Sequence, residues 1–309
     1  MSTLLVVIQF LIDLINSGFQ LFKNLKLLPF NKRKDVSRDT LNTIPERFIY
    51  LFECHGVHRN QIPAFFGHGI TLHAMTDLAE LSKQLTPEIL QQASSLFGVR
   101  QDWLECVSDK IYNVPDFYKH PEKFDQYITE LKQTTNELWC YVLRTHESTH
   151  ADDNSDGAFL FVETIGVINN REIVRYCPVG HLCIGYWKSR ADFAANCGLL
   201  IKSGIQQVGK YANKDWLNLF NSGTVIPEYD YQDGSVALAS SAVWHIDEFF
   251  ERPEHFLKGV DAEANNFGLH SAVERWLRWS EKGYFDVFGD GSHPRCRKQF
   301  ERKLEELLR

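Results

Sequence analysis

The spacing of apolar residues divides the chain into two helical regions with strands between them. At residues 41–110 and again at 245–309, apolar residues recur every three or four positions, which predicts amphipathic helices. Residues 137–145 and 158–168 are instead rich in β-branched and aromatic residues, which favours strands. The pattern therefore predicts an α+β fold with helices toward both ends of the chain.

Local start and stop signals set the expected helices of the first region. Proline in a first turn loses no hydrogen bond, and glycine ends a helix by adopting a left-handed backbone. These signals predict helices over 45–56 and 86–98. A shorter helix is expected over 60–67, a further helix beginning at Thr71, and a last turn or two over 100–107.

The middle of the chain is expected to form an antiparallel sheet. The expected strands are 137–145, 158–168, 171–178, 180–187 and 224–231. Asn169-Asn170 favours a tight hairpin turn, and Pro227 restricts the last strand to a sheet edge. Helices are expected at 125–134, before the strands, and at 189–208, where Ser189 is the expected cap.

The N-terminal segment 3–22 predicts an amphipathic helix with a wide apolar side, because its polar residues share one face. Asp13 disfavours a membrane span, and the segment has neither the basic start nor the cleavage site of a signal peptide. The helix suits packing on the protein's own body or on a second subunit. Basic residues at 23–34 also suit a weak contact of residues 3–34 with an anionic membrane surface.

Composition narrows the class of protein. The 309 residues are 44% hydrophobic and 24% charged, which excludes a disordered chain and a multi-span membrane protein. The formal net charge of −7 means that any basic footprint for nucleic acid is local. Seven cysteines, an odd number spread along the chain, favour a reducing compartment. We therefore expect a cytoplasmic protein, or one at the periphery of a membrane.

Residues 43–109 resemble the lambda-repressor/Cro-like (XRE-type) helix-turn-helix family. The stretch from Ile62 to Gly67 stands in for the family's leucine-alanine-x-x-leucine-glycine second helix, and Ile70-Thr71 opens the third. Residues 96–104, with Trp103 and Leu104 expected to point inward, match the family's closing segment. The resemblance covers about a fifth of the chain.

The resemblance implies a DNA-binding transcriptional regulator of bacterial or phage type, whose third helix enters the major groove. The DNA-binding residues that it implies are Arg59, Asn60, Gln61, Thr71, His73 and Thr76. Residues 41–110 carry five basic and eight acidic residues, however, and DNA affinity depends strongly on phosphate neutralisation. The alternative is a protein-interaction or membrane-peripheral scaffold that keeps a helix-turn-helix fold without binding DNA.

A short motif introduces a third hypothesis. His146, Glu147 and His150 match the H-E-x-x-H signature of zinc hydrolases and are the candidate metal ligands. Because an expected strand precedes the motif and turn-forming residues follow it, a polar hairpin loop is the favoured interpretation. Cys177, His181 and Cys183 lack a second pair with zinc-finger spacing. We assign no cofactor and no catalytic residue, and expect the protein not to be an enzyme.

Aromatic and cationic residues are concentrated where the strands meet the covering helix. The candidate ligand-binding residues are Arg175, Tyr186, Trp187, Lys188 and Arg190. Such groups suit an anionic or planar small molecule, so the middle domain is expected to sense a ligand or to form a homo-oligomer.

The expected organisation has five parts. Residues 1–40 form the amphipathic helix and a basic linker, 41–110 the helix-turn-helix-like domain, 111–135 a connector, 136–235 the α+β domain, and 236–309 a C-terminal helical region.

Overall fold

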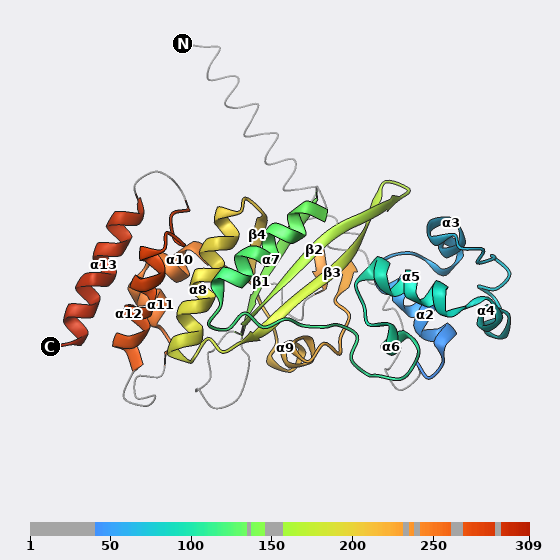
Figure 1. Cartoon of the computed structure of the whole chain (residues 1–309), viewed down its shortest axis with the longest axis horizontal. Coiled ribbons are helices and arrows are strands. Elements are labelled where there is room, and N and C mark those ends of the chain that lie inside the picture. Colours follow the sequence, from blue (N-terminus) through green and yellow to red (C-terminus); the bar gives the residue numbers. More distant parts are fainter. Residues whose placement is uncertain are drawn as a thin grey trace, which may run out of the picture. The chain divides into compact units, whose positions relative to one another are not determined.

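In the computed structural model, a five-stranded mixed sheet has helices on both of its faces, so the predicted α+β fold is confirmed (Figure 1). The structure describes residues 41–134, 137–145, 157–230, 235–237, 242–260, 268–287 and 292–309. The chain divides into two units, residues 1–41 and 42–309. The expected N-terminal helix and the His146–His150 motif lie outside the described residues.

The sheet has the strand order β3-β2-β1-β4-β7. The strands are β1 (Leu138–Arg144), β2 (Gly157–Ile168), β3 (Arg171–Leu182), β4 (Gln206–Tyr211) and β7 (Val243–Trp244). All neighbouring pairs are antiparallel except β1 and β4, which are parallel. The expectation of a purely antiparallel sheet is therefore wrong. The short strands β5 (Glu228–Asp230) and β6 (Ser235–Ala237) pair with each other in a separate sheet.

The β2–β3 hairpin turns at Asn169 and Asn170, whose φ angles of 51° and 61° confirm the predicted tight turn. β3 then continues without interruption to Leu182, so the expected separate strand at 180–187 is wrong. The Ser189 hydroxyl accepts a hydrogen bond from the Cys183 amide at 2.9 Å, which stabilises the turn that follows β3. Ser189 is therefore not the cap of the helix.

The helix expected over 189–208 is shorter than predicted. It is α8 (Trp187–Lys202), and Gly204, with φ of 76°, ends it in the left-handed region that glycine tolerates. The next residues form β4, because their backbone completes the hydrogen bonds of β1 along its free edge. Pairing with a strand far away in the sequence decides their conformation.

The helical module, residues 42–110, contains five short helices and one 3₁₀ turn. They are α2 (Ile44–Cys54), η2 (Arg59–Gln61), α3 (Ile62–Phe66), α4 (Leu78–Gln84), α5 (Pro87–Phe97) and α6 (Gln101–Leu104). Thr43 and Glu46 cap α2 reciprocally, Thr86 caps α5, and Gly98 ends α5 at φ of 69°. The predicted starts and stops of these two helices are confirmed, as is the burial of Trp103 and Leu104.

No helix begins at Thr71, which corrects the expected third helix. Residues 72–77 form three successive i→i+3 backbone hydrogen bonds, and α4 begins only at Leu78. The physical reason is a competing cap: the Asp77 carboxylate accepts from the amides of Ala79 and Glu80 at 2.9 and 3.3 Å. Thr71 also makes a cap-type bond, because its hydroxyl accepts from the Ala74 amide at 3.3 Å, but only turns follow it; its amide and hydroxyl both bond the Gln84 side chain.

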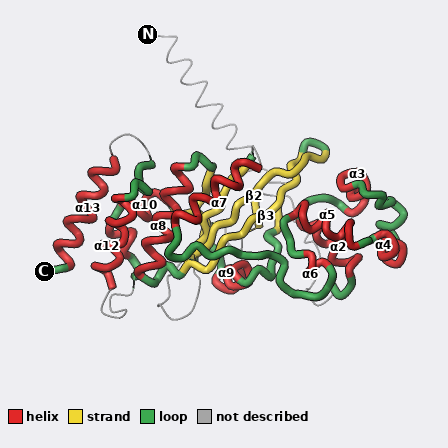
Figure 2. The backbone as a smooth tube through the Cα atoms, in the orientation of Figure 1, coloured by secondary structure: helices red, strands yellow, loops and turns green. Residues whose placement is uncertain are grey.

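Both faces of the sheet are covered, and alternate residues of a strand pack into two different hydrophobic cores. Tyr141 and Leu143 pack with the helical module and with α9 (Lys214–Asn221). Cys140 and Val142 pack with α7 (Pro121–Thr134) and α8 on the other face. The helical module and one face of the sheet thus share one hydrophobic core, although the sequence suggested separate domains. Figure 2 shows the strands with helices on either side.

Four helices of the described residues lie beyond α8, and the helical C-terminal region that the sequence predicts is confirmed (Figure 1). They are α10 (Ile246–Glu251), α11 (Pro253–Leu257), α12 (Gly268–Glu281) and α13 (Ser292–Leu307). Trp276 of α12 stacks on Phe285 and Phe300, with ring centroids 4.6 and 3.6 Å apart, which joins α12 to α13. Among the helices that the structure describes, none has both the length and the apolar character to cross a membrane.

Candidate functional site

The carboxyl ends of the parallel strands β1 and β4 lie side by side. Arg144, the last residue of β1, pairs in register with Tyr211, the last residue of β4. Ligand sites in sheets with parallel strands lie outside the carboxyl ends of those strands. A cleft of about 770 Å³ opens at this place. The residues that give it its chemistry are Arg144, Trp244, His245, Glu248, His255 and Lys258.

Three aromatic rings hold the Arg144 side chain at the base of the cleft. Its guanidinium carbon lies 5.7 Å from the ring centroid of Tyr211, 5.3 Å from that of Trp244 and 5.5 Å from that of Phe249. Cation–π contacts of this kind orient a guanidinium through its face and leave its positive charge in place. The three rings therefore fix the position of the guanidinium beside apolar surface.

The Trp244 indole ties the two parallel strands together beneath the cleft. Its Nε1 donates to the carbonyl oxygens of Val142 and Lys210, at 3.1 and 3.2 Å. Gly209 permits this arrangement, because a Cβ atom there would lie 2.3 Å from the Trp244 carbonyl oxygen. The base of the cleft is thus rigid, which suits a preformed site.

The rim of the cleft comes from α10, α11 and the residues that follow them. The Glu248 carboxylate lies 3.5 Å from the Arg252 guanidinium and 3.6 Å from Nδ1 of His255. The side chains of His245 and Lys258 are exposed. Among the described lining residues, Arg144 and Lys258 are the lysine and arginine side chains and Glu248 is the single carboxylate, so the cleft offers groups of both signs.

Arg190, predicted to contact a ligand, lies fully buried beneath this rim. Its guanidinium donates to the carbonyl oxygens of Phe256 at 2.6 Å, Lys258 at 2.5 Å and His255 at 3.3 Å. A fourth bond reaches the Ile184 carbonyl oxygen at 3.1 Å. Arg190 therefore positions the backbone that carries two cleft residues and is itself shielded from any ligand.

The other four predicted ligand-binding residues are not among the described residues that line the cleft. Arg175 forms an ion pair with the buried Glu163 of the neighbouring strand at 2.5 Å. Tyr186, Trp187 and Lys188 gather at the start of α8, where the Lys188 ammonium lies 4.9 Å from the Trp187 ring centroid. The structure thus does not unite the five predicted residues in one site.

The six residues predicted to bind DNA all lie at or near the surface of the helical module. Arg59 of η2 places its Nε 3.3 Å from the Glu53 carboxylate, beside Asn60 and Gln61. His73 and Thr76 belong to the tight turns before α4, where the Thr76 hydroxyl donates to the His73 carbonyl oxygen. The surface that replaces the expected third helix is therefore made of turns.

The described residues contain no cluster of three or more histidine, cysteine, aspartate or glutamate side chains that could hold a metal ion. Burial raises the pKa of the Cys177 thiol to about 11, so it stays protonated near neutral pH. The hypothesis of a zinc hydrolase rests on His146, Glu147 and His150, which lie outside the described residues.

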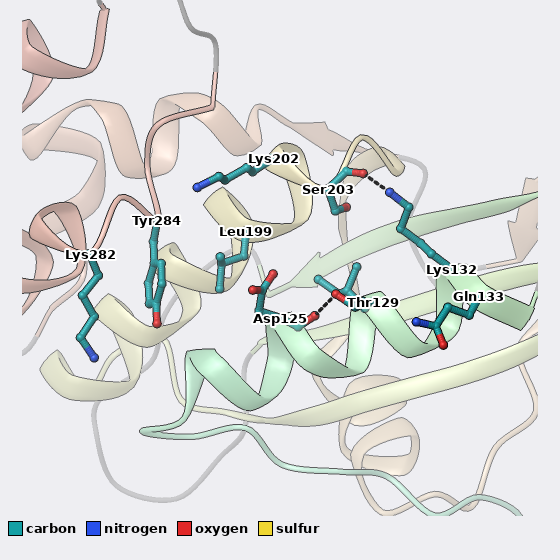
Figure 3. Close-up of a pocket in the computed structure, with 10 residues that line it drawn as sticks. Asp125, Thr129, Lys132, Gln133, Leu199, Lys202, Ser203, Lys282 and Tyr284 are labelled. Atoms are coloured by element: carbon teal, nitrogen blue, oxygen red, sulfur yellow. Dashed lines mark hydrogen bonds between the residues drawn. The ribbon is translucent and has the colours of Figure 1, made fainter.

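A second hollow, of about 540 Å³, lies between α7, the end of α8 and the turn after α12 (Figure 3). Lys132, Lys202 and Lys282 line it from these three segments. The ammonium groups of Lys132 and Lys202 donate to the carbonyl oxygens of Ser203 and Gly283, respectively. Two of the three lysines are thus engaged in hydrogen bonds within the fold, and Asp125 also lines the hollow. We therefore favour the cleft at the ends of β1 and β4 as the functional site.

Sequence reasoning missed the cleft, because its described residues come from three distant stretches, 144, 211 and 243–259. A density of aromatic and charged residues at 244–258 was the available signal. No protein-family model, curated protein or solved structure shows a significant match to the chain. The candidate site therefore rests on the geometry described above.

Proposed function

We propose that this protein is a ligand-responsive regulator: the cleft senses a small molecule, and the helical module contacts DNA. The observation that carries the proposal is the cleft itself, with a rigid aromatic base and a charged rim at the carboxyl ends of two parallel strands. A volume of about 770 Å³ suits a small organic molecule.

The shared core supports a link between the two activities. Tyr141 and Leu143 of β1 pack in the same apolar cluster as Phe48 and Phe52 of α2, and the next residue of β1 is Arg144. A shift of β1 on ligand binding would also displace side chains of the helical module, because packed cores transmit strain. The burial of the closing residues Trp103 and Leu104 agrees with the resemblance to XRE-type proteins, whereas the third helix that the resemblance implies is replaced by turns.

The ligand-binding half is tested by blocking the cleft. A chemically mixed compound collection is screened against the full chain by thermal shift. Val243 is exposed and lines the cleft, so Val243→Trp fills it without disturbing the core. Val208→Trp, at an exposed position of neighbouring β4, is the matched control. Hits are expected to lose binding in the first variant alone; no hits, or hits that both variants bind equally, would overturn this half.

The DNA-binding half is tested by gel shift at low salt with genomic fragments. We expect retardation by the wild-type chain, weakened by the triple substitution Arg59→Ala, Asn60→Ala and Gln61→Ala. The control replaces the exposed pair Gln91 and Gln92 of α5 with alanine. Absence of retardation at about micromolar protein, where non-specific DNA binding is ordinarily detectable, would overturn this half.

A second function, contact between copies of the chain, is favoured by one observation. Leu72 and Leu78, which flank the turns before α4, are 58% and 42% exposed. The basic residues nearest in sequence, Arg59 and Lys83, pair with Glu53 and Glu80. Such a surface suits protein better than phosphate. Sedimentation analysis tests it: Leu72→Ser with Leu78→Ser is expected to convert oligomer to monomer, and a monomeric wild-type chain would refute it.

A further inference from the structure

The outward face of α13 carries a row of basic side chains. Arg295, Lys298 and Arg302 are all exposed, and their spacing of three and four residues places them on one face of the helix. We call these three residues the α13 stripe. The opposite face, with Phe300 and Leu304, packs into the hydrophobic core against α12 (Figure 1). The stripe therefore faces away from the core on a helix whose other side is fixed by packing.

The order of charge along α13 is the reverse of the order that stabilises a helix. The helix dipole favours acidic residues at the amino end and basic residues at the carboxyl end. In α13 the first turn holds Arg295 and no acidic residue, whereas the last turn holds Glu305 and Glu306 and no basic residue. The stripe thus adds positive charge to the electropositive end of the helix. A sequence that departs from local preference in this way is expected where a binding function requires it.

The basic residues of α13 outside the stripe have acidic partners. Arg297 pairs with Glu301 at 2.9 Å. Lys303 pairs with Glu306, also at 2.9 Å. Within the described part of the chain, no acidic side chain forms an ion pair with the stripe. The residues directly before α13, 288–291, contain one acidic residue. The helix therefore separates paired cations on its flank from a row of cations on its outward face.

We propose that the α13 stripe binds the phosphate backbone of duplex DNA. The stripe extends over seven residues, about 10 Å along the helix axis, and one strand of duplex DNA presents about three phosphates in that length. A row of three cations therefore matches a repeated anion better than a single small one. Since α13 turns Phe300, Leu304 and Leu307 inward, it has no apolar face to insert into a lipid surface.

This contact is separate from the one proposed for the helical module. The module packs against one face of the sheet, and α13 belongs to the core on the other face. Contacts to phosphate carry no base information, so the stripe is expected to bind duplexes of different sequence with similar affinity. It would add affinity for DNA without adding specificity.

The test measures fluorescence anisotropy of a labelled duplex of about 20 base pairs with the full chain, over a series of salt concentrations. The variant combines Arg295→Gln, Lys298→Gln and Arg302→Gln. We expect its affinity at about 50 mM salt to fall about tenfold or more. The slope of log affinity against log salt is expected to become shallower by about 2 to 3, because about one unit is lost with each phosphate contact.

The matched control removes the same charge elsewhere on the surface. It combines Lys119→Gln, Lys123→Gln and Lys214→Gln, at exposed positions outside α13, and is expected to change the affinity by less than about twofold. Thermal unfolding of both variants is measured in parallel. The stripe variant is expected to unfold at the same temperature as the wild type or higher, because the unfavourable charge at the amino end of α13 is removed.

The outcomes separate this inference from the proposed function. Equal loss of affinity in both variants, or no loss in the stripe variant, would overturn the stripe as a DNA contact. DNA binding that only the triple alanine variant at 59–61 weakens would do the same and leave the module's contact standing. Vesicles of phosphatidylserine that bind through the stripe, without DNA binding, would assign it to a membrane instead. A wild-type chain that binds no duplex would overturn both DNA contacts.

Discussion

The imidazole ring of His55, directly after α2, packs against the phenol ring of Tyr176 in β3, with centroids 5.0 Å apart. Phe97 of α5 contacts the same imidazole at 4.3 Å. His55 is completely buried where the helical module meets the sheet, and its Nδ1 donates to the Leu51 carbonyl oxygen at 2.7 Å. Burial lowers the pKa of this imidazole from 6.5 to about 4, so His55 is neutral in the folded protein at neutral pH.

The free energy of unfolding is expected to fall as the pH decreases from 6.5 to about 4. In that window the unfolded chain protonates His55 and the folded chain does not, which lowers stability by up to about 3 kcal/mol. Urea unfolding of the wild type and of His55→Leu over this range checks it, since other titrating groups act on both proteins. The same pH slope in both would refute the assignment.

Arg275→Ala is expected to destabilise the protein strongly. The fully buried Asp192 carboxylate accepts from Nε and Nη2 of Arg275, at 2.8 and 3.2 Å, and from the Trp279 indole at 3.0 Å. Removing the guanidinium leaves a buried charge without its counter-ion, at a cost of about 3–5 kcal/mol. Chemical denaturation measures the loss. Arg278→Ala, exposed one turn away on α12, is the control, at less than about 0.5 kcal/mol.

Arg190→Lys is expected to lower stability by several kcal/mol although the charge is kept. An ammonium group has three donors and cannot reproduce the planar fork that reaches four carbonyl oxygens, and each buried carbonyl left unpaired costs about 1–3 kcal/mol. Thermal unfolding measures the effect. Lys188→Ala, nearby on the same helix, should unfold as the wild type does. A wild-type melting temperature for Arg190→Lys would show that these bonds contribute little.

Gly209→Ala is expected to displace β7 and to weaken the cleft together with overall stability. The added methyl group would meet the Trp244 carbonyl oxygen at 2.3 Å, and overpacking of this kind costs about 1–3 kcal/mol. Val208→Ala, an exposed neighbour on β4, is the comparison and should change stability little. Denaturation, and titration with a cleft ligand found in the thermal-shift screen, follow both effects; unchanged values in Gly209→Ala would contradict the close packing.

Features that depend on neighbouring residues could be predicted from the sequence. The reciprocal cap at Thr43, the end of α5 at Gly98 and the turn at Asn169-Asn170 each use side chains within a few positions, and all three are present. The start of α4 was mistaken because two good N-caps compete. Both residues accept cap hydrogen bonds, Thr71 from the Ala74 amide and Asp77 from the amides of Ala79 and Glu80, but a helix follows only Asp77.

Features that depend on distant pairing could not be predicted. Residues 206–211 form a strand only because β1 offers its free edge, and the apolar pattern of the preceding helix extended the prediction through them. Arg144 enters a cleft only because β1 and β4 end at the same level. The prediction that Arg190 contacts a ligand was wrong, because its burial beneath the rim depends on α11, which lies far along the chain.

The parallel pairing of β1 with β4 has a consequence for how the chain is made. Antiparallel β1, β2 and β3 leave the ribosome in sequence and can join at once, whereas β4 emerges only after α8. Until then the nascent protein carries an unpaired sheet edge along β1, a template for aggregation that a chaperone would have to shield. Because Arg144 gains its neighbours Tyr211 and Trp244 only when β4 and β7 have been made, the cleft cannot form until those late strands have left the ribosome.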